Sequence, residues 1–150
     1  MNTPAPALSV ADVCTAAKVR RLSRRITQIY DEALTPHGLT IGQYGLLACL
    51  SRRRGTAIGA LAGMLAADAS TMSRLVRPLE VAGLISIRAS TEDKRSKLVW
   101  LSDDGHRRRS AAQAGWQAAQ ARIAELLGDS RLAALRFMLD EAHERLETAI

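Results

Sequence analysis

The sequence predicts a mainly helical fold that carries one small β-wing. Apolar residues recur at steps of three and four over most of the chain, the pattern of helices with one buried face. Two segments between residues 84 and 101 instead alternate apolar and polar residues, as half-buried strands do. Two short helical patterns precede them, separated by a tight turn at residues 66–67. This order predicts a winged helix-turn-helix lobe between long terminal helices.

Composition and charge are consistent with a single domain over residues 1–150. Aromatic residues make up only 3% of the chain, so Leu, Ala, Ile and Val must fill the core. Residues 1–109 carry 17 basic and 9 acidic side chains, whereas residues 110–150 carry 4 basic and 6 acidic ones. A basic head before a mildly acidic helical tail suits a polyanion-binding lobe with an assembly element. Charge alone leaves open that the basic residues are ordinary solvated surface.

The first helix is expected over residues 11–34, after a loose arm at residues 1–9 that holds two prolines. Pro36 cannot continue the helical ladder, and Gly38 allows a sharp turn, so the helix should end there.

A second helix should begin at Thr40, where Gln43 completes a capping box, and should end near Leu50. Residues 51–55 (SRRRG) form a basic loop, and a third helix follows over residues 58–65.

Asp68 is the expected N-cap of the fourth helix, which Gly83 ends. Two antiparallel strands are expected next, at residues 84–89 and 97–101, joined by a charged tip at residues 90–96. Together residues 40–101 form the predicted winged helix-turn-helix lobe.

Ser102 should cap a long helix that Gly128 breaks, and a last helix should span residues 130–149. The helices at 11–34 and 102–150 have apolar faces that a small lobe cannot cover. The simplest cover is a second copy of the chain, so these are the expected dimerisation helices. A two-fold dimer would place two recognition helices about 34 Å apart, one turn of a palindromic DNA site.

The fourth helix and the wing carry the candidate DNA-binding residues. Short hydroxyls let a helix sit deep in the major groove, Arg can bind guanine through two hydrogen bonds, and a guanidinium on a ribbon can enter a narrow minor groove. The alternatives are a solvated helix face and a charged hairpin that only aids solubility. The expected contacts to double-stranded DNA are made by Ser70, Thr71, Ser73, Arg74, Arg77, Asp93, Lys94, Arg95 and Lys97.

Two motifs resemble the MarR family of bacterial transcriptional regulators. Residues 93–105 (DKRSKLVWLSDDG) resemble the D-x-R…V-x-L-T…G wing signature of that family, with Ser102 in place of the usual Thr. Residues 61–85 (LAGMLAADASTMSRLVRPLEVAGLI) resemble its helix-turn-helix, including the "LE…GL" at residues 79–84. The resemblance runs from about residue 11 to the end of the chain.

The resemblance implies a homodimeric repressor that a small aromatic or phenolic ligand releases from DNA. The residues at the corresponding junctions are Tyr30, His37, Tyr44 and Trp116, each of which could equally be a packing residue. The alternative within the family is a peroxide sensor that uses a cysteine on the first helix.

Cys14 lies near the start of that helix, one turn from Lys18. Ligand release is the primary expectation and peroxide sensing the alternative, because a cysteine on a mostly apolar helix is more often a small packing residue. Cys49 lies in an apolar run and is expected in the core. A rival from another class is a helical interaction module whose lobe binds a protein.

Several classes of function are not indicated. The chain has no nucleophile–base grouping, phosphate-binding loop or dinucleotide fingerprint, so no enzyme and no cofactor is expected. Its three histidines lie far apart in sequence, so no metal site is expected. No apolar run approaches the roughly 18 residues of a membrane span, and no signal peptide is visible. The expected location is cytoplasmic, with both cysteines as reduced thiols.

Overall fold

The computed structural model describes residues 13–90 and 96–149. The chain divides into two compact units, one of residues 30–120 and one that combines the described residues before 30 with those after 120. We call the first the lobe and the second the helical unit. No helix in the described part of the chain is both long and apolar enough to cross a membrane.

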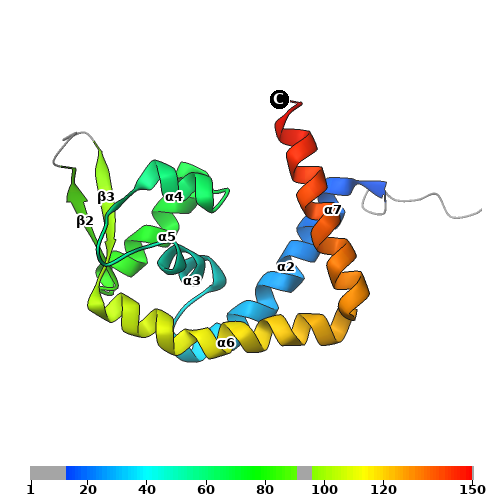
Figure 1. Ribbon diagram of the computed structural model, residues 1–150, viewed down its shortest axis with the longest axis horizontal. Helices are drawn as coiled ribbons and strands as arrows, with labels where there is room; N and C mark the ends of the chain where they lie inside the picture. Colours follow the sequence, from blue (N-terminus) through cyan, green and yellow to red (C-terminus); the bar gives the residue numbers. More distant parts are fainter. Residues whose placement is uncertain (1–12, 91–95, 150) are drawn as a thin grey trace, which may run out of the picture. The chain divides into compact units, whose positions relative to one another are not determined.

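The lobe is mainly helical, with a small sheet beside its helices (Figure 1). Helices α2 (Thr15–Leu34) and α6 (Asp103–Leu127) each contribute to both units. The elements between them are η1 (Thr35–His37), α3 (Ile41–Ala48), β1 (Thr56–Ala57), α4 (Ile58–Met64), α5 (Ala69–Val81), β2 (Ile85–Ala89) and β3 (Lys97–Leu101).

The sheet has three antiparallel strands in the order β1-β3-β2. The sequence predicts only the β2–β3 ribbon, and its register pairs Ile85 with Leu101 and Ala89 with Lys97. The additional strand β1 pairs Thr56 with Val99. The two-strand prediction is incomplete because a strand of two residues carries no alternating pattern of its own.

Local capping sets the starts of three helices, as the sequence predicts. Thr40 and Gln43 form the complete capping box of α3, with the Gln43 side chain accepting from the Thr40 N–H at 3.0 Å. The Asp68 carboxylate accepts from the Thr71 N–H at 2.6 Å and caps α5. The Ser102 hydroxyl accepts from the Gly105 N–H at 2.9 Å at the start of α6.

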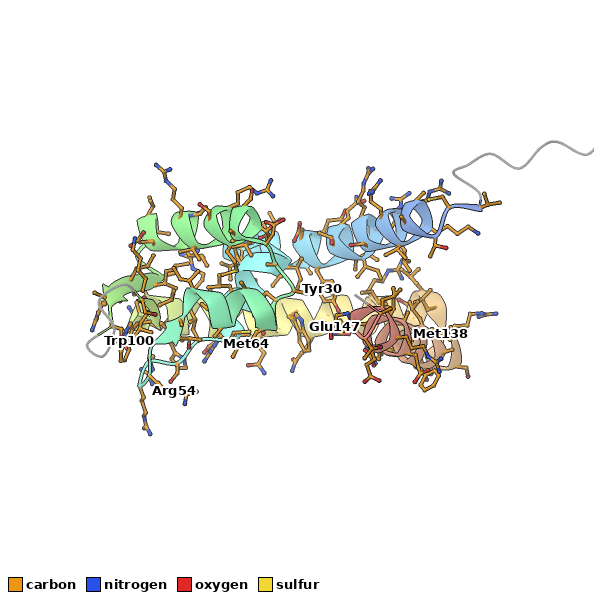
Figure 2. The ribbon with its side chains drawn as sticks, turned by 90° about the horizontal axis from the view of Figure 1, so that it is seen from above. Tyr30, Arg54, Met64, Trp100, Met138 and Glu147 are labelled. Carbon is orange, nitrogen blue, oxygen red and sulfur yellow. The ribbon has the colours of Figure 1, made fainter. Side chains whose placement is uncertain are left out.

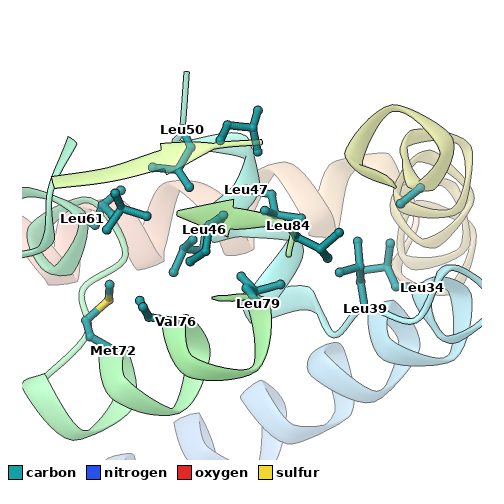
Figure 3. Close-up of a cluster of buried hydrophobic side chains, with 14 residues drawn as sticks. Leu34, Leu39, Leu46, Leu47, Leu50, Leu61, Met72, Val76, Leu79 and Leu84 are labelled. Atoms are coloured by element: carbon teal, nitrogen blue, oxygen red, sulfur yellow. The ribbon is translucent and has the colours of Figure 1, made fainter. Parts of the chain in front are cut away.

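The lobe has a continuous apolar core made mostly of leucines, which come from its helices, its sheet and the segments that connect them (Figure 3). Leu46, Leu61 and Val99 are fully buried within it. Helix α3 lies close to α5 at Gly42, where a Cβ would come within 2.9 Å of Leu75. Only a residue without a side chain fits this contact unless Leu75 moves.

Arg109 on α6 forms hydrogen bonds with the backbone at the end of α3. Its guanidinium donates to the carbonyls of Leu47 at 3.0 Å and Leu50 at 3.2 Å. The last carbonyls of a helix lack the usual N–H donor four residues on, so the charged donor adds to the hydrogen bond that the Leu47 carbonyl accepts from the Leu50 N–H at 3.3 Å. A basic run such as residues 106–109 is usually solvated, but Arg109 is half-buried and makes these contacts inside the lobe.

The helical unit buries far fewer apolar side chains. Its helix α7 (Asp129–Glu147) starts after Gly128, whose φ of 76° is a left-handed conformation that breaks the chain from α6. Ile123 and Leu132 are buried, but the side chain of Met138 lies at the surface (Figure 2). The large apolar side chains exposed in this unit are Val13, Val19, Leu22, Leu126, Phe137, Met138, Leu139 and Leu146.

Candidate nucleic-acid interface

Helix α5 divides cleanly into a buried and an exposed face. Met72, Val76 and Leu79 recur at helical spacing and are buried in the lobe core. Because successive residues of a helix point in different directions, the polar residues between these positions lie on the other side of α5. The exposed candidate DNA-binding residues on α5 are Ser70, Ser73, Arg74 and Arg77, whereas Thr71 is half-buried.

The first turn of α5 is a small polar network. The backbone N–H of Thr71 donates to Asp68, and this hydrogen bond is the main reason that the pKa of the Asp68 carboxyl is lowered. The nearby Arg74 charge lowers that pKa further, and the Arg74 guanidinium lies 3.5 Å from the Thr71 hydroxyl. The backbone N–H and the hydroxyl of Thr71 are thus both engaged within this turn.

The second turn of α5 borders an apolar cleft. Ser73 and Arg77 line a cavity of about 500 Å³ together with Ile58 of α4 and Ile87 of β2. The sequence places Ser73 and Arg74 in one candidate set, but Ser73 faces this cleft beside α4 and the sheet.

Pro78 lies inside α5, a feature not used in the sequence interpretation. Proline has no N–H, so the helical hydrogen bond to the Arg74 carbonyl cannot form. The backbone between the two arginine-bearing turns is therefore less restrained than in an uninterrupted helix.

The wing is described only in part. Lys97 is exposed at the start of β3, opposite Ala89. Asp93, Lys94 and Arg95 lie outside the described residues, so their predicted contacts stay predictions.

Arg88 on β2 is a further exposed cation of the wing, which the sequence reasoning missed. Its guanidinium lies 5.4 Å from the ring centroid of Trp100 on β3, within the range of a cation–π contact. Alternation along β2 could have identified it, because Arg88 follows the half-buried Ile87 on the opposite face.

The basic loop before β1 adds further positive charge to the lobe. Arg52, Arg53 and Arg54 are all exposed, and Figure 2 shows Arg54 extending from the surface. Arg52 forms an ion pair with Asp103 at 3.1 Å, which joins this loop to the start of α6.

Comparison with known proteins identifies the lobe. The MarR family model matches residues 39–97, which cover α3 to the start of β3. Over these residues the lobe is similar to the MarR family. The organic hydroperoxide resistance transcriptional regulator of Bacillus subtilis (strain 168) is 31% identical over 83 residues, 55% of this chain and 56% of that protein. The chain thus matches about half the length of this curated relative.

Solved structures extend the likeness in fold over most of the chain. The M. tuberculosis transcriptional regulator MOSR, in complex with DNA, matches with a TM-score of 0.74 and 29% identity over 89% of this chain and 98% of that one. The PcaV transcriptional regulator from Streptomyces coelicolor, in complex with its natural ligand, matches with a TM-score of 0.80 and 19% identity. That match covers 93% of this chain and 98% of PcaV and shows the fold alone.

Two of the four candidate ligand residues of the lobe, Tyr44 and Trp116, stack on each other. Tyr44 of α3 and Trp116 of α6 have ring centroids 6.2 Å apart and planes 20° apart. Both rings and that of Tyr30 pack against the lobe core. His37 lines a different cavity, and its carbonyl accepts a hydrogen bond from Arg108.

The two cysteines are free thiols in different settings. Cys14 is half-buried just before α2, where its carbonyl accepts from the Lys18 N–H at 3.1 Å. Cys49 ends α3 and packs against the lobe core, as the sequence predicts. Within residues 13–90 and 96–149, no group of three or more His, Cys, Asp or Glu side chains is arranged to hold a metal ion.

Proposed function

We propose that this chain is a DNA-binding transcriptional repressor that acts as a homodimer on a palindromic operator. The proposal rests mainly on the division of α5 into a buried apolar face and an exposed polar face. Its apolar stripe is buried, so Ser70, Arg74 and Arg77 are exposed, on the helix that a helix-turn-helix presents to the major groove. The MarR-family match over the same residues and the DNA complex of MOSR support this assignment.

The exposed cations divide into two roles. Arg74 and Arg77 on α5 are the base readers, since a helix in the major groove brings such side chains to base edges. Lys97 and Arg88 on the wing contact phosphates, and Arg95 enters the minor groove. Phosphate contacts position a protein on DNA, whereas base contacts select the sequence.

A second copy of the chain covers the helical unit. Exposed Met138, Leu139 and Leu146 on α7 recur at helical spacing and form an apolar surface that water would otherwise cover. The dimer holds two lobes at a fixed spacing, and an operator with two inverted half-sites follows from this symmetry.

The test is operator selection followed by matched substitutions. An operator is first selected from random double-stranded DNA by the full-length chain. We then expect Arg74→Ala to relax the sequence preference and to weaken binding by about 1–3 kcal/mol. Lys97→Ala should weaken binding to all sequences alike and reduce the salt dependence by about one unit. Arg122→Ala, in an exposed ion pair on α6, is the control and should change neither property.

Measuring affinity at several salt concentrations also distinguishes DNA binding from the binding of a protein partner. Affinity for DNA falls steeply as salt rises, because bound cations are released from the phosphates. A mostly apolar protein interface responds weakly to salt. If no DNA sequence is enriched, or if Arg74→Ala and Lys97→Ala behave alike, the assignment of base readers on α5 is wrong.

A small aromatic or phenolic ligand is the first candidate for the signal that releases DNA. The stacked Tyr44–Trp116 pair, with Tyr30 also against the core, supplies aromatic surface at the junction of α3 and α6. A ligand that contacts this pair would change the tryptophan fluorescence of Trp116, and Tyr44→Leu should weaken that response.

A second candidate signal is an organic hydroperoxide. The match to the hydroperoxide resistance regulator, together with the half-buried Cys14 thiol, favours this signal. In this reaction the Cys14 thiolate attacks the peroxide, takes one oxygen to become a sulfenic acid, and leaves the corresponding alcohol. Parent and Cys14→Ser are treated with cumene hydroperoxide while bound to the operator. Release of the parent alone supports this signal, and equal behaviour of the two excludes it.

A further inference from the structure

One face of α2 carries a dense cluster of positive charge. Residues 13–30 contain four arginines and one lysine and no acidic side chain. All four arginines are exposed, and Figure 2 shows nitrogen-tipped side chains extending from this helix. They form two pairs, each one helical turn apart, which we call the arginine face: Arg20 with Arg24, and Arg21 with Arg25. The arginine face belongs to the helical unit and not to the lobe.

The arginine face lies opposite the apolar side of α2. At about 100° of rotation per residue, Val19, Leu22 and Ile26 share one side of the helix and the four arginines share the other. A second copy of the chain that covers the apolar side therefore leaves the arginines available to a further partner.

Three of these arginines border a hollow in the surface. Arg21, Arg24 and Arg25 line, together with Gln28, a cavity of about 340 Å³. Nη1 of Arg25 donates to Oε1 of Gln28 at 3.4 Å, which leaves the other donors of this guanidinium for another acceptor. Like charges one helical turn apart destabilise a helix, so an anion that lies across this face would stabilise it.

Two arginines elsewhere in the helical unit are instead balanced by acids on their own helices. Arg122 is paired with Glu125 at 2.6 Å, and Arg145 is paired with Glu141 at 3.1 Å. No ion pair between described residues involves the arginine face. Its positive charge is therefore uncompensated within the described part of the chain.

We propose that the arginine face is a second DNA-binding surface, which contacts the phosphate backbone of a duplex without reading its sequence. The choice of DNA as the partner rests on the proposed function, because the lobe would bring duplex DNA to the chain. Guanidiniums bind phosphate through paired hydrogen bonds. Phosphate contacts hold a protein on DNA but do not select bases.

The composition of α2 favours a duplex over other partners. Residues 13–29 contain no aromatic side chain, whereas surfaces for single-stranded nucleic acid stack bases on aromatic rings. Duplex DNA presents one negative charge per roughly 1.7 Å of its axis, a density that suits closely spaced guanidiniums. No large apolar residue lies between the arginines on their side of the helix, as the centre of a protein interface would require.

The test is the salt dependence with which the full-length chain binds a random-sequence duplex. Arg21→Gln with Arg25→Gln removes two charges from the arginine face. We expect the slope of log affinity against log salt to fall by about two units for each chain on the DNA, since each phosphate contact contributes about 0.9. Arg21→Lys with Arg25→Lys keeps the charge and should retain most of the slope.

A matched control removes the same charge from ion-paired positions. Arg122→Gln with Arg145→Gln should leave the slope nearly unchanged, because both guanidiniums are already neutralised by glutamates. Sedimentation and circular dichroism should show the parent's assembly and fold in every variant. If the first pair alters assembly, Arg20→Gln with Arg24→Gln carries the test, with the same expected fall.

Two further probes identify the partner. The glutamine variant of the arginine face should lose more affinity for the duplex than for single-stranded DNA of the same length or for poly-glutamate. An unchanged slope, an equal fall in the control, or a duplex loss no larger than that for the other probes would each overturn the second DNA surface.

Operator selection keeps this inference distinct from the proposed function. If no operator is enriched but the arginine face still sets the slope on random duplex, the proposed sequence-specific function fails and the second surface stands. If an operator is bound and the slope does not depend on the arginine face, the second surface alone is refuted.

Discussion

The lobe and the helical unit differ in where their apolar side chains lie. In the lobe, core leucines such as Leu34, Leu47 and Leu79 are almost completely buried, and Leu46 has no exposed surface. In the helical unit, Met138 is 61% exposed and Leu146 is 65% exposed. Both units are made from similar proportions of leucine and alanine, so composition does not explain the contrast.

The contrast indicates that the two units acquire their stability in different ways. The lobe has a core within one chain and can be stabilised by that chain alone. The helical unit exposes large apolar side chains on both α2 and α7, which favours association with another chain. Substitutions in the lobe core should therefore lower the free energy of unfolding of the single chain. Substitutions on the exposed apolar faces of the helical unit should instead weaken association between chains.

The largest effect is expected from breaking assembly. Replacing Met138 and Leu139 together by Glu puts charge on the exposed apolar face of α7. We expect a monomer by sedimentation and a loss of operator affinity of about 10²–10⁴-fold, because two linked lobes no longer bind together. Far-ultraviolet circular dichroism should show a folded lobe. A double variant that stays dimeric would mean that this face is not the interface.

A matched pair of leucines tests the contrast directly. Leu46→Ala should lower the free energy of unfolding by about 2–5 kcal/mol at every protein concentration, since it leaves a cavity in the lobe. Leu146→Ala should lower the free energy of unfolding only at protein concentrations where the proposed dimer is populated. Denaturant titrations of each variant at two protein concentrations measure the loss of unfolding free energy and its dependence on concentration. Similar losses for both variants at low concentration would contradict the division between folding and assembly.

Arg109 should be more important to the lobe than its neighbour Arg107. Arg109→Leu removes a charged donor from two carbonyls at the end of α3, and we expect a loss of about 1.5–3 kcal/mol in the free energy of unfolding. Arg107→Leu removes an exposed ion pair on the same helix and should cost about 0.5 kcal/mol or less. Equal effects would show that the Arg109 hydrogen bonds add little.

The smallest effect is a pH dependence at the start of α5. The Thr71 N–H lowers the pKa of Asp68 below its ordinary value of 3.8, so the folded chain favours the carboxylate. The stability from this interaction is fully present above that value and is lost as the pH falls through the lowered pKa. We expect the melting temperature of the parent to exceed that of Asp68→Asn near neutral pH. The difference should shrink below about pH 4, and a constant difference would rule out this charge effect.

Features set by neighbouring residues could be predicted from the sequence. The caps at Thr40, Asp68 and Ser102 each depend on a partner three residues away, and all three are present. The buried stripe of α5 follows from helical spacing alone, and it correctly exposes Arg74 and Arg77.

Features set by distant partners could not be predicted. Strand β1 exists because Thr56 meets Val99, far along the chain. Arg109 binds carbonyls 59 and 62 residues away, and no local pattern distinguishes it from Arg107. In the candidate site, Ser73 turns toward the cleft with Ile58 and Ile87 because of how α4 and β2 pack beside α5.

The short strand β1 has a mechanical consequence. Thr56 and Ala57 pair with the central strand β3, and the next residue, Ile58, already begins α4. The wing is therefore coupled through backbone hydrogen bonds and an uninterrupted chain to the first helix of the helix-turn-helix. A force applied to the wing is transmitted to α4 without an intervening hinge. Wing and helices should engage a surface as one rigid body, with a single kinetic phase of association.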